Sequence, residues 1–155
     1  MPTPQVKAYL DDVGVPYVVV PYEHAYDAQH VAAAAHISGK RLAKTVIIKA
    51  DDELVMAVVP ADARVDCDRL KEVLGVESAE LATESDFRGR FGDCEVGAMP
   101  PFGPLFDVDV FVDESLTQAG PLAFRAGTHG ELIRMSYDDF ERVAAPQVMS
   151  LAYHR

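Results

Sequence analysis

Hydrophobic and polar positions follow two different periods along the chain, and each change of period marks the border of a predicted element. Apolar residues recur at helical spacing between residues 6 and 13, with Pro4 at the first helical position and Gly14 placed to end the helix. Residues 17–22 are rich in β-branched and aromatic side chains, which predicts a strand. The alanine-rich run 28–37 predicts a second helix. The chain therefore opens with a helix, a strand and another helix.

Two apolar runs that flank a short acidic turn predict a β-hairpin. Residues 43–49 and 53–60 are rich in β-branched side chains, and Asp51 and Asp52 lie between them. The apolar run 46–48 is continuous instead of alternating, which is typical of a strand buried on both faces. We therefore expect the first strand of this hairpin to be central in a sheet.

Two kinds of signal recur in the second half of the chain: capping residues that begin helices, and apolar runs that form strands. With the first half, they predict one α+β domain over residues 1–155 with a mixed, largely antiparallel sheet. In chain order the expected elements are a helix from Asp66 or Asp68 to Leu74, a strand at 78–81, a brief helix from Thr83 to near Gly89 or Gly92, strands at 105–112, 121–125 and 131–135, and a last helix at 137–144 capped by Ser136.

A glycine- and proline-rich loop at 97–103 separates two strand-like regions. Pro100 and Pro101 each fix φ at about −65°, and glycines at both ends permit unusual backbone angles. A loop with so little freedom loses little entropy when a ligand docks, which suits a binding wall. An ordinary proline-rich turn is the alternative. The backbone amides that we expect to be available as donors are those of Gly97, Ala98, Met99 and Phe102.

Composition indicates a globular protein, and we expect it to be cytoplasmic. It has 155 residues, of which 49% are hydrophobic, enough for a substantial core. It shows no signal peptide and no apolar run of the roughly 20 residues that span a bilayer, so we expect no membrane partner. Cys67 and Cys94 lack metal-ligand spacing and are expected to be reduced thiols.

Charge narrows the range of partners. The net charge of −11, from 14 basic and 25 acidic residues, argues against broad adhesion to nucleic acid, and we expect no DNA partner. One segment is locally basic, with Lys40, Arg41 and Lys44 close together, and it could guide a phosphate into a site. Lys44 directly precedes Thr45 in the apolar strand, so its stem is expected to pack while its ammonium serves an ester carbonyl or a phosphate. The alternative for Lys44 is a solvated lysine at a strand edge.

The sequence offers no self-contained catalytic set. The five histidines show no metal-ligand pattern, and there is no nucleophile elbow or phosphate-binding loop. His24, just after a strand, and His129, between two glycines, are the better functional candidates, with surface or packing roles as the alternative. Cys94 is expected to be a buried thiol. We expect no metal and no cofactor.

Several of these motifs together resemble the YbaK/EbsC-like family, which includes the editing insertion of bacterial prolyl-tRNA synthetase. The matching pieces are the segment 22–24, the pair Lys44-Thr45, the loop 97–103 and Gly127, within a similar order of helices and strands. The resemblance implies a barrel-like mixed sheet flanked by helices and a hydrolase that removes wrongly attached amino acids from tRNA. Its partner would be the acceptor end of a mischarged tRNA, with a synthetase or an elongation factor as an optional helper.

The resemblance also implies roles for individual residues. Lys44 would hold the terminal nucleotide or the reacting ester, while Gly97 through Pro101 would supply amides and a wall around the amino-acid side chain. A ribose hydroxyl of the substrate would help to position water, and the protein would supply orientation and charge stabilisation. The residues implied in catalysis are Lys44, Gly97 and Pro101, and those implied in substrate binding are Tyr22, His24, Thr45, Ala98, Met99, Pro100, Phe102, Gly103, Gly127 and His129.

The amino acid removed stays open at this point, with a small one, on tRNA for proline or another tRNA, as the expectation. The turn at 126–130 lacks the serine and lysine of the cysteine-removing members, and Met99 and Phe102 would suit a small or apolar side chain. Two other functions are alternatives. A non-catalytic module that binds an aminoacyl group or a nucleotide for a synthetase would fit the acidity, whereas a nucleic-acid-binding regulator lacks a basic helix to support it.

Overall fold

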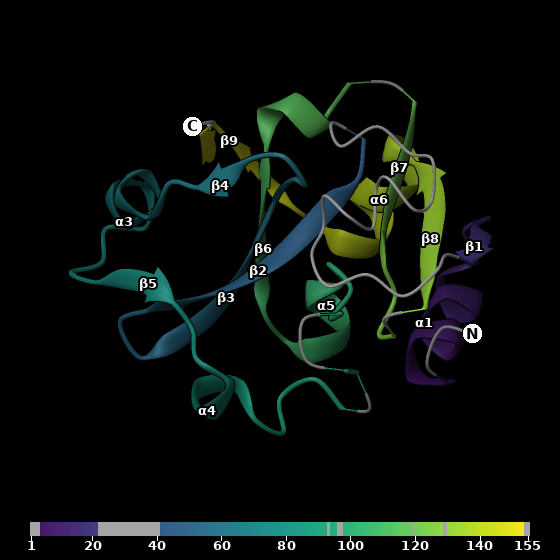
Figure 1. The fold of residues 1–155 in the computed structure, drawn as a ribbon, viewed down its shortest axis with the longest axis horizontal. Coiled ribbons are helices and arrows are strands. Elements are labelled where there is room, and N and C mark those ends of the chain that lie inside the picture. The colour runs from purple at the N-terminus through teal and green to yellow at the C-terminus, as the bar shows by residue number, and fades with distance from the viewer. Residues whose placement is uncertain are drawn as a thin grey trace.

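The computed structural model describes residues 4–21, 41–92, 94–95, 98–118, 120–128 and 130–153 (Figure 1). The helix expected at 28–37 and the site candidates Tyr22, His24, Gly97 and His129 lie outside the described residues. The described helices are α1 (Pro4–Val13), α3 (Cys67–Leu74), α4 (Glu84–Phe87), α5 (Gly103–Phe106), α6 (Tyr137–Ala144) and the 3₁₀ helix η1 (Glu114–Leu116). The described strands are β1 (Val18–Pro21), β2 (Ala43–Ala50), β3 (Glu53–Pro60), β4 (Arg64–Val65), β5 (Ala79–Leu81), β6 (Asp109–Asp113), β7 (Pro121–Arg125), β8 (Glu131–Ser136), β9 (Gln147–Met149) and β10 (Ala152–Tyr153).

The main sheet has the strand order β5-β2-β3-β6-β9. The expected hairpin lies at its centre, because β2 and β3 pair antiparallel along their whole lengths, from Ala43 opposite Pro60 to Ala50 opposite Glu53. Strand β5 adds antiparallel to β2, whereas β6 and β9 add parallel on the other side. The sheet is therefore mixed, as the sequence predicted.

A second, antiparallel sheet has the order β1-β8-β7. It joins the main sheet at an isolated parallel bridge between Leu42 and Ala123, where the Ala123 amide donates a 3.0 Å hydrogen bond to the Arg41 carbonyl. A two-stranded antiparallel ribbon pairs β10 with β4. The described strands thus form three connected sheets flanked by helices and do not close into one barrel.

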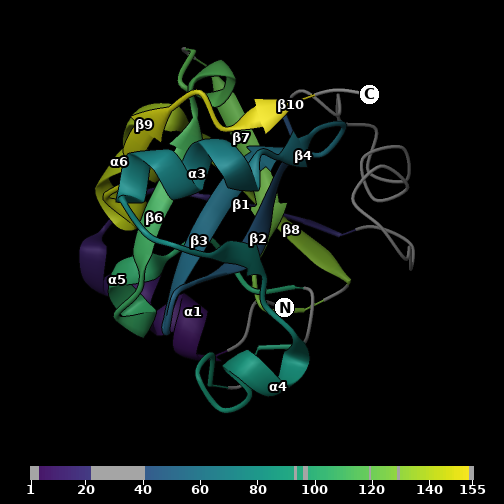
Figure 2. The ribbon, with the colours of Figure 1, turned by 90° about the vertical axis from the view of Figure 1, so that its left-hand side faces the viewer.

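The two faces of the main sheet are buried by different elements. Helix α3 lies across one face (Figure 2), and its Leu70 packs with Ile48 and Phe111 in the smaller core cluster. The other face packs against the second sheet and helices α1, α5 and α6 in a larger cluster, which includes Ile47 and Phe124. Neighbouring residues of β2 therefore enter different cores, which confirms that this strand is covered on both faces.

Local capping chemistry explains where the short helices begin. The Asp66 carboxylate accepts a 3.1 Å hydrogen bond from the Arg69 amide at the start of α3. Thr83 and Asp86 form a reciprocal capping box at α4, as expected from their spacing. Ser136 caps α6 in the same way as Asp66 caps α3.

The expected strand at 105–112 is wrong in its first half. Residues Gly103–Phe106 form the short helix α5, and β6 begins only at Asp109. Pro104 suits the first turn of a helix, and the turn closes where the Val108 amide donates to the Gly103 carbonyl at 3.0 Å. Alternating apolar residues continue through both elements, so the pattern could not separate them.

Candidate functional site

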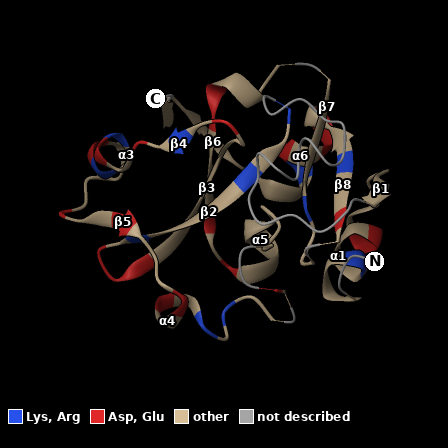
Figure 3. Ribbon diagram, viewed as in Figure 1, with Lys and Arg blue, Asp and Glu red and all other residues tan. Residues whose placement is uncertain are grey.

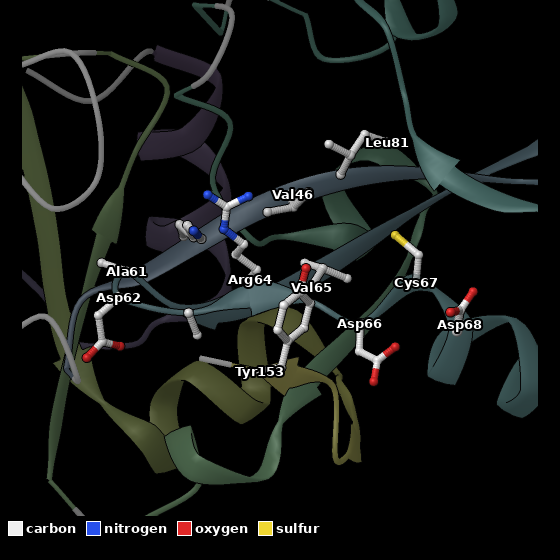
Figure 4. A pocket seen from close by; sticks show the side chains of 12 residues that line it. Val46, Ala61, Asp62, Arg64, Val65, Asp66, Cys67, Asp68, Leu81 and Tyr153 are labelled. Atoms are coloured by element: carbon white, nitrogen blue, oxygen red, sulfur yellow. The ribbon is translucent and has the colours of Figure 1, made fainter. Parts of the chain in front are cut away.

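Lys44 lies in β2 just after the Leu42 bridge, and it lines an open cavity of about 920 Å³. The cavity extends along the turn between β3 and β4, the start of α3 and strand β10 (Figure 4). Lys44 is the one predicted site residue among the described residues that line it. The other lining residues are Val46, Ala61, Asp62, Ala63, Arg64, Val65, Asp66, Cys67, Asp68, Leu81 and Tyr153.

Basic and acidic side chains occupy different parts of this cavity. Figure 4 shows the Arg64 guanidinium extending over β2 toward Val46. Asp66 and Asp68 lie at the start of α3 and point away from Arg64, while Asp62 lies at the opposite end. The positive charge of the cavity is therefore concentrated on its β2 side, where Lys44 is also located.

Cysteine chemistry does not account for the site. Burial raises the pKa of the Cys67 thiol, and the nearby charges of Asp66 and Asp68 raise it further. The thiol is therefore protonated at neutral pH and is a poor nucleophile. Cys94 is half-buried and packs against the larger core cluster, although the sequence predicted full burial.

The C-terminal part of the 97–103 loop is packed into the core. The ring of Phe102 is completely buried, with ring centroids 5.6 Å from Tyr9 and 5.4 Å from Phe124. Gly103 lies so close to the residue that precedes β6 that a Cβ atom there would collide with the Val108 carbonyl oxygen. These contacts give Phe102 and Gly103 packing roles, and their contact with a substrate stays a prediction. The two prolines, Pro100 and Pro101, are buried as well.

Met99 lines a separate, smaller cavity of about 100 Å³. The aromatic rings of Phe87 and Phe91 and the thiol of Cys94 line the same space. Met99 is only 6% exposed, so its side chain forms part of the wall of this cavity and does not lie on the protein surface. Glu84 and Arg88 line it too, so this small space has an apolar wall and a charged one, and its size suits a short side chain.

Two backbone hydrogen bonds hold Gly127 against the predicted loop. The Gly127 amide donates to the Ala98 carbonyl at 2.7 Å, and the Glu95 amide donates to the Gly127 carbonyl at 2.7 Å. Gly127 has a φ of 96°, which a side chain would strain. The structure therefore brings together two predicted pieces, Gly127 and Ala98, that are far apart in sequence.

One expected donor of the loop is already engaged. The Ala98 amide donates a 3.0 Å hydrogen bond to the Glu95 carbonyl, so the expectation that it is available was wrong. The amides of Met99 and Phe102 make no backbone hydrogen bond within the described residues.

Lys44 and the loop belong to opposite faces of the main sheet. Side chains alternate along a strand, so Lys44 shares a face with Ile48, which packs under α3. Thr45 and Ile47 point to the other face, where Ile47 and Met99 belong to the same core cluster. A site that uses both Lys44 and the loop must therefore extend around an edge of β2.

Such an edge exists next to Lys44. Strand β5 pairs with β2 from Ile48 to Ala50, with one further hydrogen bond from the Ala82 amide to the Ile47 carbonyl, and β7 bridges Leu42, just before β2 begins. These two neighbours of the same edge stop short of each other, and no other described strand pairs with the stretch between them, where Lys44 lies. A substrate that passes around this edge would contact both faces of the sheet.

Arg64 and Tyr153 are cavity residues that the sequence analysis missed. They face each other across the two-residue ribbon of β4 and β10. No local pattern predicts a ribbon this short, because its two strands are far apart in sequence and neither shows a period. The sequence therefore carries no signal that would have paired Arg64 with Tyr153.

Comparison of the chain with known proteins identifies its family. The family model for the aminoacyl-tRNA editing domain matches residues 22–143, which is most of the chain. The chain belongs to the aminoacyl-tRNA editing domain family. This confirms the resemblance inferred from Lys44-Thr45, the 97–103 loop and Gly127.

Curated relatives of this editing domain include proline–tRNA ligases. The ligase of Bacillus cytotoxicus is 32% identical over 88 residues, and that of Bacillus cereus (strain AH187) is 28% identical over 88 residues. Each match covers 57% of this chain but only 15% of the ligase. The similarity is therefore to one part of a much longer enzyme.

Solved structures share the fold of this editing domain at low sequence identity. A crystal structure of a protein proposed to be a trans-editing enzyme for prolyl-tRNA synthetase superimposes with a TM-score of 0.81 at 20% identity, covering 97% of this chain and 98% of that one. A crystal structure of a hypothetical protein superimposes with a TM-score of 0.84 at 19% identity, covering 96% and 99%. These likenesses confirm the α+β fold.

The distribution of charge on the editing domain explains how an acidic chain can contain a basic site. Figure 3 shows acidic segments along α4 and the turn between β2 and β3, both charges on α3, and basic segments within β2 and β4. Among the described residues, no group of three or more His, Cys, Asp or Glu side chains is placed to hold a metal ion. No described helix has the length and hydrophobicity needed to cross a bilayer.

Proposed function

We propose that this chain, as one editing domain over residues 1–155, is a trans-acting deacylase that hydrolyses the ester of a mischarged tRNA. The observation that supports this most directly is the position of Lys44, beside an open cavity and at a stretch of the β2 edge that no other described strand pairs with. Family membership supports the reaction class. The likeness to a protein proposed to trans-edit for prolyl-tRNA synthetase supports tRNA for proline as a first substrate to test.

In the proposed reaction, a water oxygen bonds to the ester carbonyl carbon, and the bond from that carbon to the ribose oxygen breaks. The ribose oxygen takes up a proton, so the products are the free amino acid and the intact tRNA. The Lys44 ammonium holds the terminal nucleotide or the ester, and a ribose hydroxyl of the substrate orients the water. Positioning and charge stabilisation of this kind can lower a barrier by several kcal/mol.

The loop supplies the other half of the proposed site. Because the Ala98 amide is engaged with Glu95, the donors proposed for the developing oxyanion are the other three expected amides of the loop, those of Gly97, Met99 and Phe102. The Gly127 hydrogen bonds fix the position of this segment, which keeps such donors oriented. Tyr22, His24 and His129 are proposed to complete the substrate-binding wall, and the cavity of Met99 to receive a small amino-acid side chain.

The experiment that tests this function measures loss of radiolabelled amino acid from a panel of mischarged tRNAs. The panel contains alanyl-, cysteinyl- and seryl-tRNA for proline, and seryl- and threonyl-tRNA for other acceptors, each with and without added synthetase. We expect wild type to hydrolyse at least one member. Lys44→Ala should lower kcat roughly 100-fold or more, as removal of an oriented charge does in other active sites.

Lys49→Ala provides a matched control on the same strand. Lys49 lies on the opposite face of β2 from Lys44, where it pairs with Asp86 at 3.6 Å, and it does not line the cavity. Its replacement should leave the rate unchanged. No hydrolysis of any tRNA by wild type would instead favour a non-catalytic binding module.

A further inference from the structure

The ribbon formed by β4 and β10 carries an aromatic–basic pair next to Lys44. Tyr153 lies directly opposite Arg64 in the antiparallel register, and both line the cavity of Lys44. Residues opposite each other in an antiparallel pair project their side chains on the same face. The C-terminal ribbon thus contributes to the cavity, although β10 lies beyond the region that the family model matches.

Both side chains are presented to solvent. Tyr153 is 40% exposed and Leu81, which lines the same cavity, is 63% exposed. Arg64 is exposed and forms no ion pair with any described residue. An exposed apolar surface beside an arginine and a lysine offers a face for stacking and charge for a phosphate, the combination that binds single-stranded nucleic acid.

A buried carboxylate holds this ribbon in place. Asp113, at the end of β6, is 5% exposed, and its Oδ1 accepts 2.8 Å hydrogen bonds from the amides of Leu151 and Ala152. Its Oδ2 accepts from the amide and the hydroxyl of Ser115. The C-terminal strand is therefore anchored immediately before Tyr153, which limits the freedom that a bound base would remove.

We propose that Arg64 and Tyr153 form a subsite for the single-stranded 3′ end of the tRNA, with Tyr153 stacking on a base and Arg64 binding a backbone phosphate. The subsite rests on the proposed function and deepens it. Lys44 would act on the terminal residue, while this subsite holds the nucleotides that precede it. Asp66 and Asp68 repel phosphates from the α3 side and so direct the RNA toward β2.

The first experiment measures binding of an uncharged single-stranded RNA that ends in the CCA sequence, by fluorescence anisotropy at several salt concentrations. Arg64→Gln should weaken binding about fivefold, and it should lower the slope of log affinity against log salt by about 0.7, the value for one lost phosphate contact. Tyr153→Leu should weaken binding roughly fivefold or more, whereas Tyr153→Phe, which keeps the ring, should bind as wild type does.

Arg134→Gln is the matched control for charge. Arg134 is exposed on β8, in the other sheet, and does not line the cavity. Equal binding by Arg64→Gln and Arg134→Gln would overturn the arginine contact. Equal binding by Tyr153→Leu and wild type would overturn the stacking contact. Thermal unfolding of each variant verifies that the fold is retained.

The second experiment separates this inference from the proposed function. On a hydrolysed mischarged tRNA, Arg64→Gln and Tyr153→Leu should raise KM several-fold with kcat unchanged, in contrast to Lys44→Ala. Hydrolysis with an unchanged KM would refute the subsite and leave the deacylase standing. RNA binding that depends on both residues, without hydrolysis of any tRNA, would support the subsite and refute the deacylase.

Discussion

Replacement of Asp113 by alanine tests the anchor of the C-terminal ribbon. The mutation removes the acceptor of the Leu151 amide, whose residue is completely buried, and a buried amide without a partner costs about 1–3 kcal/mol. The residue Ala152 is partly accessible to water, so the loss of the acceptor of its amide costs less free energy. Loss of the cap on η1, where Asp113 accepts from Ser115, costs about 1 kcal/mol more. We therefore expect Asp113→Ala to lower the free energy of unfolding by about 2–4 kcal/mol.

The pH dependence of that loss provides a second readout. Burial acts to raise the pKa of Asp113, but the hydrogen bonds from Ser115, Leu151 and Ala152 outweigh it, and the pKa lies below its ordinary value. A carboxylate whose pKa is lowered by folding stabilises the fold above its unfolded pKa of about 3.9, and this contribution is lost as pH falls through the folded pKa. The difference between wild type and Asp113→Ala should therefore be full at about pH 6 and shrink below about pH 4.

Urea denaturation of both proteins between about pH 6 and pH 3 measures this difference. Asp109→Ala is the control, because Asp109 lies on the same strand but is exposed. The reasoning is refuted if Asp113→Ala loses less than about 0.5 kcal/mol, the range of surface substitutions. It is refuted equally if the two variants lose stability alike, or if the difference stays constant as the pH falls.

Three further predictions concern the loop and the helix that follows it. Phe102→Ala should lower the free energy of unfolding by about 3–5 kcal/mol, measured by urea denaturation, because it leaves a cavity between two other rings. Gly103→Ala should lose about 1–3 kcal/mol in the same assay, because its Cβ would collide with the Val108 carbonyl oxygen; unchanged stability would show that β6 can move. Met99→Ala should change the ranking of alanyl, cysteinyl, seryl and threonyl esters in the hydrolysis assay, and an unchanged ranking would show that Met99 does not contact the amino acid.

The elements that the sequence predicted correctly are those whose signal is local. The β2–β3 hairpin follows from two apolar runs and an acidic turn, and the capping box at Thr83 and Asp86 follows from a spacing of three residues. The start of α5 was missed because Pro104 initiates a helix inside an alternating pattern. The ribbon of β4 and β10 depends on a contact between segments far apart in the chain, which no local pattern contains.

The residues of the candidate site also divide into those with a local sequence signal and those that depend on contacts elsewhere in the fold. Lys44 could be selected because a lysine that leads into an apolar strand has its stem packed and its ammonium held in place, and Gly127 because the resemblance included it. The availability of the Ala98 amide could not be predicted, since it depends on the turn back to Glu95. The alternation of side chains along β2 could not predict the residues that surround Lys44. Arg64, for example, lines the same cavity but belongs to the separate ribbon of β4 and β10.

The opposite placement of Lys44 and the loop has a consequence for substrate choice. Because Lys44 shares a face with α3 and the loop lies on the other face, an aminoacyl-tRNA would bind with its RNA and its amino acid on different sides of the β2 edge. The ester, which joins the two, would then lie at the edge, in the stretch around Lys44 that no other described strand pairs with. A free amino-acid ester would occupy only the loop side. Such an ester should therefore react more slowly than the full aminoacyl-tRNA, and Arg64→Gln should slow only the latter.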